Sequence, residues 1–257
     1  ILNDAVISAN IKIAKKDAET GKVIPVSGVG FKIWSVDNGE YISQTINYPE
    51  ETTLDTFYTD ENGTLMLPKE VAYGDYELHE VKAPTGYFLD NESVAFTVDG
   101  SEKTIEVEKY DTPQKGKISV TKRGDVFKSV TTTGDKFTPV FEESGLSGAE
   151  FEVRAAEDIY TADGTLRASS GDVVADIITD ENGYAETAPL YLGKYTVSEK
   201  KAPMGYVLNS EEKLIELAYA GQEVAVSDAI NSSFINDYQG VNIHIEKIME
   251  HDEKFGI

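Results

Sequence analysis

Apolar and polar residues alternate along most of the chain in short runs, which is the period of a β-strand with one buried face. In two of these runs, YELHE (76–80) and YTVSE (195–199), the closing Glu80 or Glu199 shares a face with two apolar residues. Gly, Asn-Gly and Asp-Gly turns separate the runs, and no long run keeps the period of an amphipathic helix. The pattern predicts an all-β chain in which two glutamates point toward a core. Short helical turns are expected at only two places, 47–53 and 154–160.

The same sequence features occur twice, about 120 positions apart. The repeated pairs are SGVGFKI (27–33) with SGAEFEV (147–153), TDENG (59–63) with TDENG (179–183), and YELHEVKAPTGY (76–87) with YTVSEKKAPMGY (195–206). Self-similarity at a fixed spacing indicates repeated structural units. The chain therefore contains two tandem copies of one unit, and the second copy carries an insertion (124–144) that we expect to form an extra hairpin or loop.

The ends of the copies share a second pattern, in which two alternating apolar residues precede a lysine in the same phase. It occurs three times, as NIKIAK (10–15), KISVTK (117–122) and NIHIEK (242–247). An aspartate or asparagine lies 11 or 12 residues before each of these lysines, as Asn3, Asp111 and Asn236. The chain thus has three candidate first strands but only two complete units. This predicts residues of a preceding domain at 1–6, a first domain at 7–113, a second domain at 114–239, and the first strand of a following domain at 240–257.

The motif YxLxExxAPxGY resembles the glutamate-bearing strand of collagen-adhesin B-type (CnaB, or SpaA-like pilin) domains of Gram-positive surface proteins. The resemblance implies two tandem immunoglobulin-like β-sandwich domains. It also implies a self-made isopeptide bond in each, between a lysine on the first strand and an asparagine or aspartate on the last, promoted by the glutamate. The residues that match are Lys15, Glu80 and Asp111 in the first copy and Lys122, Glu199 and Asn236 in the second. Asn3 and Lys247 would pair with partners outside the chain.

An isolated charge in a protein core is costly, and an amide between the lysine and the acid or amide side chain carries no charge. Asp111 departs from the asparagine that is commoner in this family, so the first copy would release water and the second ammonia. The alternative is a buried ionic network that never condenses. Lys109 shares the inward phase of Asp111 and is a competing partner for it.

Composition narrows the classes of function. The chain has 257 residues with 46 acidic and 23 basic side chains, a formal charge of -23, which argues against nucleic-acid binding or an anionic membrane surface. It has no cysteine, so disulfides and thiolate metal sites are excluded. No apolar run is long enough to cross a membrane, and no catalytic or cofactor-binding fingerprint is present. We expect no metal, no cofactor and no turnover enzyme, beyond a single autocatalytic cross-linking event.

The expected function is a structural stalk segment of an adhesin or pilus-like protein on a Gram-positive cell wall, extracellular and monomeric, with neighbouring domains of the same chain as partners. A ligand-binding module for a host matrix protein or glycan is an alternative, using the insertion between Phe127 and Phe141 or the outward-facing Trp34. A sortase-polymerised pilin is a third, although the nearest match to its motif, Tyr48-Pro49-Glu50, lacks the lysine. The TDENG sequences are interpreted as hairpin turns rather than calcium ligands.

Overall fold

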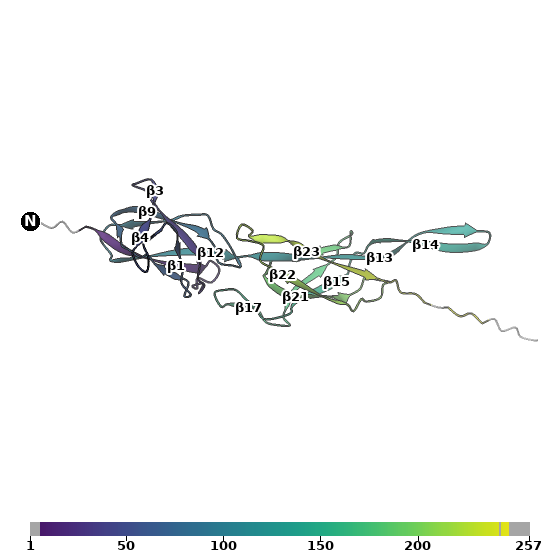
Figure 1. Ribbon diagram of the computed structural model, residues 1–257. Helices are drawn as coiled ribbons and strands as arrows, with labels where there is room; N and C mark the ends of the chain where they lie inside the picture. The colour runs from purple at the N-terminus through teal and green to yellow at the C-terminus, as the bar shows by residue number, and fades with distance from the viewer. Residues whose placement is uncertain (1–5, 242, 247–257) are drawn as a thin grey trace, which may run out of the picture.

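The computed structural model describes residues 6–241 and 243–246. In this part of the chain every regular element is a β-strand, and the strands build two sandwiches arranged in line (Figure 1). The helical turns expected near 47–53 and 154–160 were wrong, because Thr52–Leu54 and Glu150–Ala155 are strands. Cross-strand pairing, with Gln44–Ile46 and Val173–Ile178 respectively, sets the conformation at these places. The predicted all-β fold is confirmed.

The strands of the first sandwich are, in chain order, β1 (Ser8–Asp17), β2 (Gly30–Ser35), β3 (Glu40–Tyr41), β4 (Gln44–Ile46), β5 (Thr52–Leu54), β6 (Phe57–Tyr58), β7 (Thr64–Met66), β8 (Val71–Ala72), β9 (Gly74–Lys82), β10 (Tyr87–Phe88), β11 (Val94–Val98) and β12 (Thr104–Pro113). One sheet has the order β10-β12-β1-β7, with β8 also on β1. The facing sheet has the order β11-β9-β2-β3, with β6 also on β2. The strands β4 and β5 pair only with each other.

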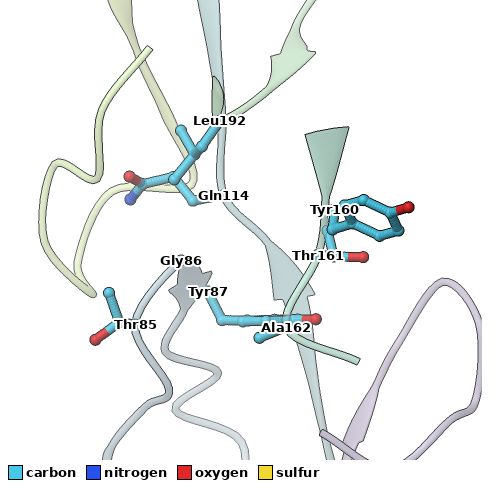
Figure 2. A pocket seen from close by; sticks show the side chains of 8 residues that line it. All are labelled: Thr85, Gly86, Tyr87, Gln114, Tyr160, Thr161, Ala162 and Leu192. Carbon is cyan, nitrogen blue, oxygen red and sulfur yellow. The ribbon is translucent and has the colours of Figure 1, made fainter. Parts of the chain in front are cut away.

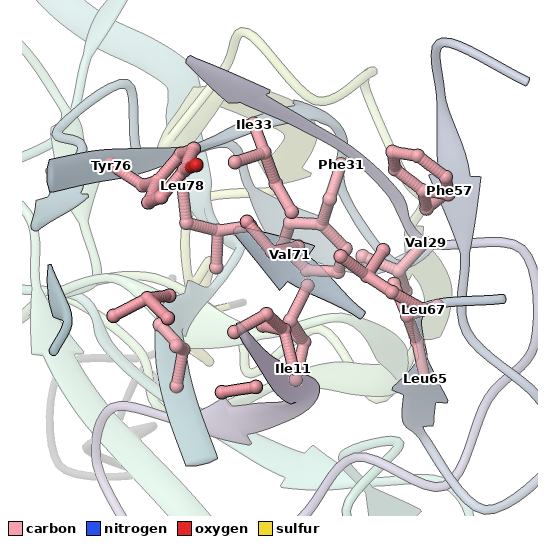
Figure 3. Packing of buried hydrophobic residues seen from close by; sticks show 14 residues of the cluster. Ile11, Val29, Phe31, Ile33, Phe57, Leu65, Leu67, Val71, Tyr76 and Leu78 are labelled. Carbon is pink, nitrogen blue, oxygen red and sulfur yellow. The ribbon is translucent and has the colours of Figure 1, made fainter. Parts of the chain in front are cut away.

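The inward residues of these two sheets form the first hydrophobic core. Ile11 of β1 faces Phe31 and Ile33 of β2 and Leu78 of β9 across the sandwich, and all four are completely buried (Figure 3). Their spacing is the alternation seen in the sequence, so the apolar face of each strand is the one that packs. The same alternation places Glu80 in this interior, two residues after Leu78.

The strands of the second sandwich are β13 (Lys115–Thr133), β14 (Lys136–Gly145), β15 (Glu150–Ala155), β16 (Ile159–Tyr160), β17 (Leu166–Ala168), β18 (Val173–Ile178), β19 (Tyr184–Glu186), β20 (Leu190–Tyr191), β21 (Gly193–Lys201), β22 (Glu212–Leu217) and β23 (Val226–Asn236). Strands β14, β19, β20 and β23 all pair with β13, and the facing sheet has the order β18-β15-β21-β22. Strands β16 and β17 form a separate small hairpin. A second core fills the space between the sheets, built around Val120, Phe151, Val197 and Phe234.

In both sandwiches the first and last strands lie side by side and run parallel. Strand β1 pairs with β12 so that Lys15 is opposite Lys109, and β13 pairs with β23 so that Lys122 is opposite Phe234. In each case the predicted partner of the lysine, Asp111 or Asn236, comes two residues further along the last strand. The two copies therefore share one register at the position that matters for a cross-link.

The insertion in the second copy is a long β-hairpin, as expected. Strand β13 continues well beyond the sandwich to Thr133, and β14 returns from Lys136 to Gly145. The hairpin projects from the end of the molecule at which the chain leaves the second sandwich (Figure 1). Among the residues that the structure describes, no helix is long and apolar enough to span a bilayer.

Candidate functional site

Each sandwich directs one lysine, one glutamate and one aspartate or asparagine into its interior from three different strands. The lysine and the acid or amide come from the parallel pair of first and last strands, and the glutamate comes from the facing sheet. Glu80 lies opposite Phe31 in the pairing of β9 with β2, and Glu199 lies opposite Phe151 in the pairing of β21 with β15. The structure thus brings together the site residues that the sequence motifs predicted.

In the first sandwich the three side chains are in direct contact and inaccessible to solvent. The Nζ atom of Lys15 donates to Oε2 of Glu80 at 2.6 Å and lies 2.6 Å from Oδ1 of Asp111. The contact with Asp111 does not have hydrogen-bond geometry, and within the described residues both Asp111 oxygens and Oε1 of Glu80 have no hydrogen-bond partner. Leaving buried polar atoms unpaired costs about 1–3 kcal/mol each. The ionised triad is therefore an unfavourable resting arrangement.

In the second sandwich the triad is fully hydrogen-bonded. The Nζ atom of Lys122 donates to Oδ1 of Asn236 and lies 3.0 Å from Oε1 of Glu199. The amide nitrogen of Asn236 donates to both oxygens of Glu199 at 2.9 Å, and the backbone N–H of Asn209 donates to Oε2 of Glu199 at 2.7 Å. The glutamate consequently touches both the amine and the amide nitrogen that would leave.

Burial changes the proton affinities of these groups in the direction that condensation requires. Removal from water raises the pKa of Glu80 to about 8, with Asp111 adding to the rise and Lys15 opposing it. Burial lowers the pKa of Lys122, and its contact with Glu199 only partly opposes this. Around neutral pH, Glu80 is thus held protonated, and a larger fraction of Lys122 is the neutral, nucleophilic amine than in an exposed lysine.

Aromatic rings line the second site. The Nζ atom of Lys122 lies 5.6 Å from the ring centroid of Phe151 and 5.8 Å from that of Phe234, and the two rings contact each other at 4.9 Å. They exclude water from the amine and contribute a cation–π attraction to its charged form. Sequence reasoning did not assign these rings to the site, although the inward phase of Phe151, on the strand beside Glu199, was a usable signal.

Lys109 does not compete for Asp111. Its buried ammonium donates instead to the carboxylate of Asp90 at 2.8 Å and to the backbone carbonyl of Glu92. The proposed pairing of Lys109 with Asp111 was therefore wrong, because the loop 89–93 folds over the end of Lys109 and supplies closer acceptors. Asn3 and Lys247, the two residues expected to pair with groups outside the chain, lie outside the described residues.

Two other sequence candidates have local roles. Trp34 points away from the core as its phase predicted, and its ring packs edge-on against Tyr41 at 5.0 Å on the outer surface of the sheet. In the first TDENG sequence, Oδ1 of Asp60 accepts hydrogen bonds from the backbone of Asn62 and Thr64, which is the geometry of an Asx turn. The interpretation of TDENG as a turn is confirmed, but as a hairpin turn it was wrong, because the strands on its two sides, β6 and β7, pair with β2 and β1 in different sheets.

The contact between the sandwiches is a feature that sequence reasoning missed. Glu19, in the turn after β1, accepts hydrogen bonds from Lys115, Arg167 and Tyr191 of the second sandwich at 2.6–2.9 Å. Arg167 also reaches the buried Asp17 at 3.2 Å. Glu19 lies on a turn and its partners lie on strands of the other sandwich, so the alternation of apolar and polar residues does not pair them in the sequence.

On the other side of the junction, the side chain of Gln114 is hydrogen-bonded to the loop before β23, donating to the carbonyl of Gly221 at 2.8 Å. A pocket between the sandwiches is lined by uncharged residues, namely Thr85, Gly86, Tyr87, Gln114, Tyr160, Thr161, Ala162 and Leu192 (Figure 2). It has neither an acid–base pair nor a set of metal ligands, so we assign it to the junction rather than to a ligand.

Comparison with known families agrees with this geometry. The family model described as "SpaA: Prealbumin-like fold domain" matches residues 9–113 and 137–230, which together are most of the chain. The chain belongs to the SpaA prealbumin-like domain family. The first segment covers nearly all of the first sandwich, and the second covers most of the second sandwich but not β13, which carries Lys122, or the end of β23, which carries Asn236. Two matches to one fold confirm tandem domains of this fold. The 23 residues between the segments hold β13 and the turn of the hairpin, whereas nearly all of β14 lies inside the second match.

Solved pilins and adhesins also match the chain, with TM-scores below 0.5. The Bacillus anthracis TIE protein is 23% identical with a TM-score of 0.53, and the match covers 90% of this SpaA-family chain and 34% of that one. A C-terminal fragment of the pilus adhesin SpaC from Lactobacillus rhamnosus GG is 18% identical with a TM-score of 0.46, covering 92% of this chain and 100% of the fragment. The chain thus spans about a third of the TIE protein. No curated protein sequence matches it.

Proposed function

We propose that the chain is a non-enzymatic stalk segment of an extracellular adhesin or pilus-like protein on a Gram-positive cell surface, and that each of its two domains, 7–113 and 114–239, closes one internal isopeptide bond. The observation that carries the proposal is the contact of lysine, glutamate and acyl group in a solvent-free site, in the same strand register in both copies. Family membership supports the surface role. The agreement of two independent copies argues against a chance ionic cluster.

In the second domain the neutral amine of Lys122 attacks the side-chain carbonyl carbon of Asn236. A carbon–nitrogen bond to Lys122 forms, the bond to the amide nitrogen breaks, and ammonia leaves. Glu199 takes a proton from the attacking amine and delivers one to the departing nitrogen, since it lies within hydrogen-bond distance of both. Holding the two groups in contact contributes roughly 7–11 kcal/mol to lowering the barrier in favourable intramolecular cases.

In the first domain the amine of Lys15 attacks the carboxyl carbon of Asp111, and water leaves. Asp111 must be protonated to react, because a carboxylate is a poor electrophile. Glu80, held protonated by its raised pKa, donates a proton to the oxygen that departs as water and takes up the proton that the amine of Lys15 loses, so Glu80 ends protonated again. The product amide is neutral, which removes the charges of Lys15 and Asp111 from the core.

The position of each bond suits a stalk that carries tension. The first and last strands are where the chain enters and leaves each sandwich, so a bond between them lets force pass without loading the remaining strands. The bond from Lys15 to Asp111 closes a loop of nearly 100 residues, which stabilises the folded state by about 4–5 kcal/mol in the chain-entropy account of cross-links.

Intact mass spectrometry of the purified chain tests the proposal. We expect a mass below the sum of the residues by one water and one ammonia. Glu80→Gln should restore the water and Glu199→Gln the ammonia, after allowance for each substitution itself. Glu216→Gln, an exposed glutamate on β22, is the matched control and should leave both losses in place. A wild-type chain that weighs the full sum of its residues would contradict the proposal.

A further inference from the structure

The turn that follows the first strand of the first sandwich forms hydrogen bonds with the second sandwich. It begins three residues after Lys15, and side chains of 19–22 contact the next unit: Glu19 with Arg167 at 2.9 Å, Thr20 with Asp163 at 2.7 Å, and Lys22 with Thr165 at 2.9 Å. The turn points in the direction in which the chain continues (Figure 1). The connection after the first strand is thus a contact element between successive units.

In the second sandwich the same topological position is occupied by the β13–β14 hairpin. Lys122 is the counterpart of Lys15, and the hairpin begins directly after it, at Arg123. Like its counterpart, it points toward the end from which the chain leaves (Figure 1). Tyr206 connects the base of the hairpin to the segment that follows β23 (237–241), which we call the exit segment. Its hydroxyl donates a hydrogen bond to the carbonyl of Asp125, and its backbone forms an isolated β-bridge with Tyr238.

One face of the hairpin is apolar and largely unpartnered within the described residues. Alternation along β14 puts Phe137, Pro139 and Phe141 on one face, and their cross-strand partners are Thr132, Val130 and Phe127. Phe137 is 71% exposed and Phe127 57% exposed. On the opposite face, Thr131 pairs with Thr138 and Thr133 with Lys136, which are polar, and Ser129 with Val140 and Val126 with Glu142, which are mixed, so no aromatic residue lies there. An exposed stripe of aromatic residues is characteristic of an interaction surface.

The apolar face of the hairpin contacts the exit segment. The ring of Tyr238, two residues after Asn236, stacks on Phe141 with centroids 4.9 Å apart and an angle of 7° between the rings. The apolar face is therefore turned toward the path that the chain follows after the second sandwich. That path leads into NIHIEK (242–247), whose pattern matches the first strands of both sandwiches.

We propose that the apolar face of the β13–β14 hairpin, formed by Phe127, Val130, Phe137, Pro139 and Phe141, docks on a third domain of the same fold, which the NIHIEK sequence pattern predicts after the second sandwich. The chain is strongly acidic, so successive units repel each other unless charges are paired across the junction or the contact is apolar. The first junction uses paired charges, and the second uses this hairpin. The inference rests on the tandem arrangement of the proposed stalk but does not require the isopeptide bonds.

The test compares hydrogen–deuterium exchange in two chains, one truncated after Val241 and the natural chain extended through the domain after Lys247. We expect hairpin amides at 127–141 to exchange roughly tenfold more slowly in the extended chain, because docking removes them from water. The double variant Phe127→Ser, Phe137→Ser should abolish this protection and broaden the inter-unit distance distribution in small-angle X-ray scattering. The control Thr131→Ser, Thr138→Ser, on the opposite face, should change neither.

Equal exchange in the two chains, or a natural sequence without a further copy of the fold after Lys247, would overturn the proposal. So would protection of the hairpin only on addition of a host matrix protein or glycan, since the face would then bind an external ligand. Loss of the isopeptide bonds is recorded separately by intact mass, so failure of the stalk chemistry and failure of the docking contact are distinguishable.

Discussion

At the scale of single residues, the central question is how two buried lysines coexist with buried carboxyl groups. The two sites answer it differently. Glu199 is satisfied by the amide of Asn236 and the backbone of Asn209, whereas Glu80 has one oxygen without a partner. The first site is accordingly the one in which protonation matters more for stability, and burial raises the pKa of Glu80 to about 8.

This raised pKa predicts a pH-dependent stability in Lys15→Met, which cannot form the first bond. The folded state holds a proton on Glu80 that the unfolded state, with a pKa near 4.5, releases. The free energy of unfolding should therefore fall as pH rises from about 4.5 to about 8, by up to about 1.4 kcal/mol per unit. Urea unfolding between pH 4.5 and 8 measures the slope.

The variant Lys15→Met, Glu80→Gln is the control for this slope, because glutamine does not titrate. It should remove the pH dependence that Glu80 contributes. An identical slope in the two variants would show that other carboxyl groups dominate and that Glu80 is not held protonated by the core.

At the scale of elements, the TDENG turn contacts the first strand next to each lysine, because the backbone N–H groups of Lys15 and Lys122 donate to the carbonyls of Gly63 and Gly183. Gly183 has a positive φ of 75°, and a Cβ added there would lie 2.2 Å from the carbonyl oxygen of Lys122. The backbone N–H of Lys122 in turn donates to the carbonyl of Gly183 at 2.7 Å. This close approach between turn and strand holds the backbone of Lys122 in place, and only glycine allows it.

Gly183→Ala should therefore destabilise the second domain and slow closure of its bond. Gly164→Ala is the matched control, since Gly164 also has a positive φ, 78°, but nothing lies within 4 Å of the added Cβ. Gly164→Ala should lower the free energy of unfolding only by the strain of the left-handed backbone, about 1–2 kcal/mol. Thermal unfolding and intact mass of both variants give the comparison, and equal effects would mean that the clash with β13 is absorbed.

At the scale of the whole molecule, the two sandwiches form a stalk only if their junction resists bending. Arg167 is central to that junction because it contacts Asp17, Glu19 and Tyr191. Both side-chain oxygens of the buried Asp17 are in use, one by the turn that follows it and the other by Tyr87 and Arg167. The contact is thus anchored in the interior of the first sandwich.

Arg167→Ala should loosen the junction without unfolding either domain. We expect a broader inter-domain distance distribution by small-angle X-ray scattering, and a smaller response to added salt than in the wild type, since the main ionic contact is already gone. Arg154→Ala, which removes an exposed pair with Glu152 inside the second domain, is the control and should leave the distribution unchanged. An unaltered distance distribution in Arg167→Ala would show that the junction is kept rigid by Gln114 and its hydrogen bond to the loop before β23.

The sequence alone determined the all-β fold, the two copies and the residues of both triads, because alternation and internal repetition record which side chains face a core. It did not determine that Lys109 binds Asp90, that Phe151 and Phe234 line the amine, or that Glu19 meets Arg167. Those contacts join segments far apart in the chain, and alternation shows which side chains face inward but not which of them meet. The apolar face of the hairpin likewise emerged only from the pairing of β13 with β14, because a bulge between Phe127 and Ser129 shifts the alternation that a reader of the sequence would follow.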